Sequence, residues 1–129
     1  MSIQIHQAIE WTGKSGAVYR YYIWPRRSLV DGSPPGNFIL VKETEDGILA
    51  PVYIGQAGDL NHRSSLSDPR IQECIHAAAV TQLHLHASHL GEQARIEEQA
   101  DLIARWAPVC NAQETPPAPD GDRSGIPLR

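Results

Sequence analysis

Residues 37–54 read NFILVKETEDGILAPVYI and contain the two most apolar strand-like runs of the chain. The runs are NFILV and LAPVYI, and the polar, glycine-containing segment KETEDGI joins them. Short apolar runs on either side of such a segment are typical of two antiparallel strands connected as a hairpin. Pro51 lacks a backbone N–H, so we expect it at a sheet edge or near the start of its strand. We therefore predict a sheet that contains this hairpin.

Further strands and helices are predicted on both sides of the hairpin. The glycines of residues 13–16 suit a turn between two earlier strands, and Asp68 followed by Pro69 is a favourable helix start. The expected elements are strands at residues 3–9, 17–24 and 80–86, a loop at 25–36, and helices at 59–63, 69–78 and 92–106. The predicted fold class is mixed α+β (α/β): a small central, mainly antiparallel sheet of about three to five strands flanked by helices.

The length of 129 residues, with 41% hydrophobic and 20% charged residues, is typical of one globular domain. We assign residues 1–111 to this domain, with an N-terminal hairpin at 1–24 and a motif-bearing core at 35–111. Beyond Asn111 the composition shifts to proline, glycine and polar residues. Such a composition buries little apolar surface, so residues 112–129 are predicted to form a disordered tail.

The sequence favours a cytoplasmic location. No apolar run approaches the roughly 20 residues that span a bilayer, and the N-terminal segment MSIQIHQAIEWTGK lacks the pattern of a secretory signal. Cys74 and Cys110 are two isolated cysteines without CxxC spacing. We expect them to be small buried apolar residues in a reducing compartment, not a disulfide framework.

The charge balance limits how the chain could bind nucleic acid. Eleven Lys and Arg against fifteen Asp and Glu give a formal net charge of −4. Neutralisation of phosphates supplies most of the non-specific affinity for nucleic acid, so such binding here requires a local basic patch. The candidate residues for this patch are Arg20, Arg26, Arg27, Lys42, Arg63 and Arg70.

Two short motifs lie in the hairpin of residues 35–55. The segment PGNFIL begins it, and Gly36, Asn37 and Phe38 stand where a Gly-Ile-Tyr motif would be. The second strand ends in an intact Tyr-Ile-Gly motif at residues 53–55.

Two later segments extend the match. YIGQAGDLNHR places Arg63 at the expected arginine, and QADLIARWAPVCN ends in a Pro-x-x-Asn element formed by Pro108 and Asn111. Taken together and in order, the four segments resemble the GIY-YIG nuclease superfamily over residues 17–112.

The resemblance implies a metal-dependent endonuclease that acts on the phosphodiester bonds of DNA. A tyrosine of the first motif helps to deprotonate water, an arginine stabilises the phosphate, and a glutamate holds one divalent ion, Mg²⁺ or Mn²⁺. Carried over, Tyr53 and Arg63 would orient the phosphate and the leaving group, and Asn111 would complete the last motif. Cleavage needs such charge neutralisation together with a positioned nucleophile.

Two positions depart from the family pattern. Phe38 occupies the first-motif tyrosine position and has no hydroxyl, and Gln99 occupies the position of the metal-binding glutamate. A neutral amide is a poor substitute for a carboxylate on Mg²⁺. Each missing contribution is worth roughly 10² or more in rate, so we expect weak or absent cleavage.

The helix predicted at 92–106 has one broad apolar arc at about 100° per residue. Its members are Ile96, Ala100, Leu102, Ile103, Trp106 and Ala107. Gln99 falls inside the arc and is expected to reach the site or a buried hydrogen bond. Glu98 falls outside it, and is an alternative metal ligand only if the helix rotates or slips.

A zinc site at His84 and His86, with His89 close behind, is the less favoured reading. Imidazoles at i and i+2 can chelate zinc, but no cysteine or carboxylate cluster completes a ligand shell. Exposed strand histidines are the simpler interpretation.

The predicted function is thus a GIY-YIG-type endonuclease-like hydrolase, weakened or inactive, with DNA as partner and no membrane association. The alternative is a non-catalytic module on the same fold that binds nucleic acid or protein. The acidic net charge favours a protein-interaction role.

Overall fold

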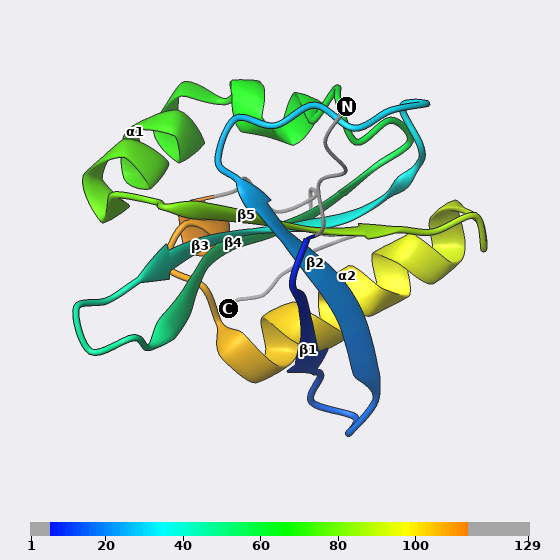
Figure 1. The fold of residues 1–129 in the computed structure, drawn as a ribbon, viewed down its shortest axis with the longest axis horizontal. Coiled ribbons are helices and arrows are strands. Elements are labelled where there is room, and N and C mark those ends of the chain that lie inside the picture. Colours follow the sequence, from blue (N-terminus) through cyan, green and yellow to red (C-terminus); the bar gives the residue numbers. More distant parts are fainter. Residues whose placement is uncertain (1–5, 114–129) are drawn as a thin grey trace, which may run out of the picture.

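A computed structural model describes residues 6–113, which form one five-stranded sheet and two longer helices (Figure 1). The strands are β1 (Ala8–Thr12), β2 (Val18–Pro25), β3 (Gly36–Glu43), β4 (Leu49–Ala57) and β5 (Gln82–Ala87). The helices are α1 (Pro69–Ala78) and α2 (Glu92–Trp106), with short 3₁₀ helices η1 (Ser64–Ser67) and η2 (Asn111–Gln113). Neighbouring strands are antiparallel in the order β1-β2-β5-β3-β4. The predicted fold class, a small antiparallel sheet flanked by helices, is confirmed.

The predicted central hairpin is formed by β3 and β4, with β4 at the edge of the sheet. Leu40 pairs with Tyr53, and the register then shifts so that Val41 pairs with Pro51. Edge strands and bulges are the places in a sheet where a missing backbone N–H is tolerated. Pro51 therefore lies where its chemistry requires.

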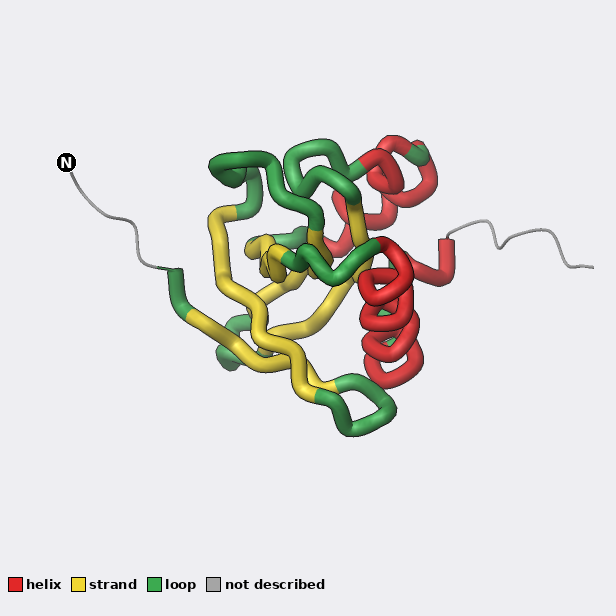
Figure 2. Tube along the Cα trace, turned by 90° about the vertical axis from the view of Figure 1, so that its right-hand side faces the viewer, coloured by secondary structure: helices red, strands yellow, loops and turns green. Residues whose placement is uncertain are grey.

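The sheet has two covered faces, because successive side chains of a strand point to opposite sides. Phe38 and Leu40 join the core cluster that includes residues of α1, whereas Ile39 and Val41 join the cluster that includes Leu102 of α2. We call these faces the α1 side and the α2 side. Figure 1 shows the two helices with the strands between them, and Figure 2 shows how strongly the sheet curves into a half-barrel.

The first predicted strand lies further along the chain than expected. It was placed at residues 3–9, and β1 runs from Ala8 to Thr12; residues 3–5 lie outside the described part. Pairing sets this position, since Thr12 lies opposite Val18 and β2 follows directly after the tight turn at Gly16, whose φ is +91°.

The short helix predicted at residues 59–63 was wrong. The Asp59 carboxylate accepts a hydrogen bond from the backbone N–H of Asn61 at 2.8 Å, which closes a turn of the kind that aspartate favours over helix. Helical structure begins only at η1, after Arg63. The two longer helices are confirmed, and Asp68 caps α1 by accepting from the Arg70 N–H at 2.9 Å.

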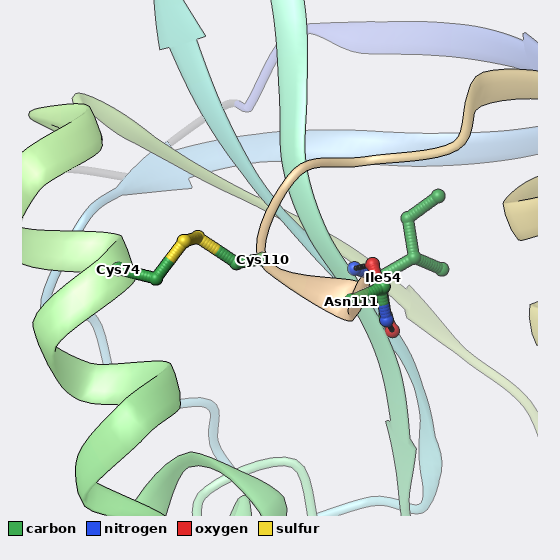
Figure 3. The surroundings of a disulfide bond; sticks show 4 residues. All are labelled: Ile54, Cys74, Cys110 and Asn111. Atoms are coloured by element: carbon green, nitrogen blue, oxygen red, sulfur yellow. Dashed lines mark hydrogen bonds between the residues drawn. A yellow bond between two sulfur atoms is a disulfide. The ribbon is translucent and has the colours of Figure 1, made fainter. Parts of the chain in front are cut away.

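The expectation for the cysteines was wrong. Cys74 of α1 and Cys110, which follows α2, form a disulfide with their Cα atoms 5.7 Å apart (Figure 3). The two cysteines are 36 positions apart in the sequence and meet because α2 runs back along the sheet, a relationship that spacing does not reveal. Disulfides persist in oxidising surroundings, so cysteine usage no longer supports a reducing compartment.

Within residues 6–113, the structure contains no helix of the length and apolarity needed to cross a bilayer. The predicted tail at 112–129 begins with the last residues of η2, and residues 114–129 lie outside the described part of the chain.

Candidate functional site

The two hairpin motifs face each other across β3 and β4. Phe38 pairs with Gly55, and the rings of Phe38 and Tyr53 lie on the α1 side with their centroids 6.0 Å apart. Both side chains are 0% exposed. Tyr53 is therefore a core residue in this conformation, without the open surface that contact with a phosphodiester would require.

Arg63 lies at the start of η1 and not on a helix. Its Nη1 donates a hydrogen bond to the carbonyl of Leu60, and its guanidinium carbon lies 5.8 Å from the centroid of the Phe38 ring. Partial burial lowers the pKa of Arg63, although an arginine stays charged under all ordinary conditions. The structure thus brings Arg63 to the same side as Phe38 and Tyr53.

Beside Arg63, a groove with a volume of about 510 Å³ opens on the α1 side. Arg26 and Arg27, from the loop after β2, line it together with Arg63, and His76 of α1 is another lining residue. None of the described residues that line this groove is Asp or Glu. We call it the arginine groove. Three cations collected in one concave surface attract anions more strongly than three separate ones.

The remaining candidates for the basic patch lie elsewhere. Arg20 pairs with Glu10 at 3.5 Å, and Arg70 pairs with Asp68 at 3.2 Å. Lys42 is exposed near the end of β3. Within the described part of the chain, no carboxylate forms an ion pair with any of the three cations of the arginine groove. The six predicted residues therefore divide into one groove and scattered surface charges.

Gln99 and Asn111 meet at the outer edge of β4. The Asn111 side chain accepts from the Ile54 N–H at 2.8 Å and donates to the Ile54 carbonyl at 2.8 Å (Figure 3). Gln99 Nε2 donates to the same carbonyl at 3.3 Å. The amide of Asn111 completes the edge of the sheet as another strand would, so both residues satisfy backbone groups of β4.

The placement of Glu98 outside the buried face of the last helix was wrong. It is 7% exposed, and one carboxylate oxygen accepts from the Tyr21 hydroxyl at 2.6 Å and from His86 Nδ1 at 2.9 Å. Ile96, expected inside the apolar arc, is 41% exposed. The polar partners on the sheet, not the apolar period, decide which side of α2 is buried, since a buried carboxylate needs hydrogen-bond donors.

This carboxylate belongs to a row of polar side chains on the α2 side. Asn37 pairs with His86 on one neighbouring strand and with Gln56 on the other. Arg95 of α2 donates to the Gln56 side chain at 3.1 Å, and its carbonyl accepts from Asn37 Nδ2 at 2.9 Å. The sequence did not predict this row, because its members lie on different strands and are neighbours only once the strand pairing is known.

Burial and the negative charge of Glu98 raise the pKa of Tyr21 well above its usual value. The hydroxyl therefore stays protonated and keeps donating to Glu98. A short, charge-assisted hydrogen bond of this kind holds α2 firmly against the sheet.

His84 is buried rather than exposed as expected. Trp11 Nε1 donates to its Nδ1 at 3.0 Å, and its Nε2 lies 2.8 Å from Gln82 Oε1. These partners suit the neutral ring, with the proton on Nε2, and burial lowers the pKa of His84 to about 4. The ring is therefore a structural hydrogen-bonding group.

The predicted Mg²⁺ or Mn²⁺ stays a prediction, and its two candidate ligands in α2 both have protein partners. One carboxylate oxygen of Glu98 accepts from both Tyr21 and His86, and Gln99 directs its amide N–H at a backbone carbonyl. Within residues 6–113, no three His, Cys, Asp or Glu side chains gather in a way that could hold a metal ion. The sheet also separates Glu98 from Tyr53 and Arg63, which lie on its other face.

Comparisons with protein-family models, with curated proteins and with solved structures found no match. The resemblance to the GIY-YIG superfamily therefore stays a prediction.

Proposed function

We propose that this chain binds nucleic acid without cleaving it, and that the phosphates of the nucleic acid lie in the arginine groove. One observation carries the proposal: Arg26, Arg27 and Arg63 converge on one concave surface without a carboxylate among its described lining residues. Arginine offers several N–H donors in a planar fork that matches phosphate oxygens. This is the nucleic-acid-binding alternative of the sequence analysis.

The negative net charge of the whole chain confines the binding of nucleic acid to the arginine groove. The whole chain carries a formal net charge of −4, so it repels polyanions except where cations are concentrated. Binding through few phosphates is weak and strongly dependent on salt. We therefore expect measurable affinity at low ionic strength and a sharp loss as salt is added.

The absence of cleavage is proposed from the positions of the family residues. Phe38 has no hydroxyl to act on water, and the Tyr53 side chain is enclosed in the core. Glu98, the buried carboxylate of α2, lies on the other side of the sheet from Arg63. Each such absence removes a contribution that cleavage requires.

Binding is tested by fluorescence anisotropy of a labelled oligonucleotide with the wild-type chain and an Arg26→Gln/Arg27→Gln double variant. We expect the double variant to bind roughly 10- to 30-fold more weakly at about 0.1 M salt. Arg20→Gln is the matched control, because Arg20 is a cation outside the groove. Equal affinity of the double variant and the control would refute the groove, and no binding at low salt would favour the protein-interaction alternative.

Cleavage is tested by incubating plasmid and single-stranded DNA with Mg²⁺ or Mn²⁺ and the wild-type chain, Gln99→Glu or Ala100→Glu. We expect intact DNA in every case, since Gln99 bonds to the edge of β4 and not to the groove. Ala100→Glu controls for the added charge at an exposed neighbouring position. Cleavage by the wild-type chain would contradict the proposal, and cleavage gained only by Gln99→Glu would show a decayed nuclease site.

A further inference from the structure

A second groove lies on the α1 side, with a volume of about 380 Å³. Tyr22 and Trp24 of β2 line it with His6, which precedes β1. The rings of His6 and Trp24 are stacked, with centroids 3.7 Å apart and planes at 16°. His6 Nδ1 donates to the Ile23 carbonyl at 3.0 Å and so holds this stack against the strand. We call it the aromatic groove.

The aromatic groove adjoins the arginine groove along two segments of the chain. Trp24 lines one groove, and Arg26 and Arg27, two and three residues later, line the other. Leu60 lines the aromatic groove, and its carbonyl accepts the hydrogen bond from Arg63. The two surfaces are therefore neighbours, and a single extended ligand can cover both.

The loop between the grooves is held in place. The Asn61 side chain accepts from the Val30 N–H at 2.7 Å and donates to the Val30 carbonyl at 2.8 Å. Val30 lines the aromatic groove. These two bonds hold Val30, which follows Arg26 and Arg27 in the same loop, beside Asn61, so the loop is anchored to the segment that carries Leu60 and Arg63.

We propose that the aromatic groove receives an unpaired base of the same nucleic acid whose phosphates lie in the arginine groove. The preferred ligand is then single-stranded. This inference rests on the proposed function. Tyr22 is 43% exposed and offers ring surface to a base, and Trp24, one face of which is covered by His6, lines the groove beside it. Bases of a duplex are already stacked and paired, whereas an unpaired base stacks on aromatic rings regardless of its sequence.

The competing occupant of an apolar groove is a segment of another protein, which would leave nucleic-acid binding to the arginines alone. The two cases differ in their dependence on bases. With phosphates only, the affinity for a single strand is the same whether or not its bases are present. With a stacked base, removal of the bases lowers affinity severalfold or more, and sometimes a hundredfold.

The experiment compares the full chain with a normal single-stranded oligonucleotide and with an abasic one of equal length, both at low salt. We expect the wild-type chain to bind the abasic strand at least fivefold more weakly. Trp24→Leu should lose this preference while keeping the salt-dependent binding, and Trp24→Phe should restore most of it. Thermal unfolding of each variant checks that the fold is intact.

The outcomes separate the two proposals. Equal affinity of the wild-type chain for both strands overturns base stacking and leaves phosphate binding standing. Binding to neither strand overturns the proposed function and, with it, this inference. A preference for the normal strand that persists in the folded Trp24→Leu variant places the base elsewhere and also overturns the assignment.

Discussion

Gly55 and Phe38 are directly opposite each other in the β3–β4 pair, and the Phe38 ring occupies the space that a side chain at position 55 would need. A Cβ added to Gly55 would lie 2.4 Å from Cζ of Phe38. Real Cβ atoms do not approach a ring so closely, so the glycine is required by the phenylalanine. The two motif positions are coupled by packing, whatever their role in function.

Gly55→Ala is expected to lower the free energy of unfolding by about 1–3 kcal/mol, because the added methyl overpacks the core. Phe38→Leu should relieve part of the clash, so that the double variant loses less stability than the two single losses predict when added. Urea denaturation of the four proteins measures this coupling. Simple additivity would contradict the packing argument, and Gly58→Ala, at a position with open space around it, is the control.

The disulfide gives a second prediction. Cross-linking residues 36 apart restricts the unfolded chain, so removing the bond by Cys74→Ser/Cys110→Ser should lower the free energy of unfolding by about 3–4 kcal/mol. The same loss is expected when the wild-type chain is denatured with a thiol reductant, and the reductant should not affect the double variant. A wild-type chain indifferent to reductant would refute the bond.

Glu98 gives a third. Glu98→Ala leaves the Tyr21 hydroxyl and His86 without their shared acceptor, which should lower the free energy of unfolding by about 2–4 kcal/mol. Glu97→Ala, at an exposed neighbouring position, should change it by less than about 0.5 kcal/mol. Denaturation of both variants makes the comparison. Equal effects of the two variants would show that Glu98 lies on the solvent-facing side of the helix, as the apolar pattern predicts.

The elements of this fold are predictable because their signals are local. The apolar runs of β3 and β4, the glycine turn before β2 and the Asp68 cap of α1 each lie within a few residues. The side of α2 that is buried is not predictable in this way. Glu98 is buried there and Ile96 is exposed, because Tyr21 and His86 on two different strands donate hydrogen bonds to Glu98. The pattern within the helix contains no information on these partners.

The candidate site divides in the same manner. The family pattern identified Arg63, and the structure places Arg63 in the groove. Arg26 and Arg27 could be named only as members of a wide basic set, because the loop that carries them is positioned by the contact of Asn61 with Val30, 31 residues away in sequence. The Cys74–Cys110 pair was missed for the same reason.

His84 gives a prediction for pH. Its pKa is about 4 in the folded chain and 6.5 when unperturbed, so between these values the unfolded state binds a proton that the folded state does not. Above pH 6.5 the ring is neutral in both states, so it does not change the free energy of unfolding with pH. This free energy falls as the pH drops from 6.5 towards 4. The loss of unfolding free energy approaches about 3–4 kcal/mol at most.

The measurement is the free energy of unfolding against pH for the wild-type chain and His84→Gln. The variant lacks the titrating ring, so its decline across this window should be shallower than that of the wild-type chain. Parallel curves would mean that His84 is not held neutral by Trp11 and Gln82.

The salt dependence of single-strand binding tests the arginine groove most directly. Each neutralised phosphate contributes about 0.7 to the slope of log affinity against log salt, so the three arginines predict a slope of about −2. Arg26→Gln/Arg27→Gln retains only Arg63 and should give about −0.7, whereas Arg20→Gln should keep the wild-type slope. A slope near zero, or one that the double variant leaves unchanged, would contradict a phosphate-binding role for this groove.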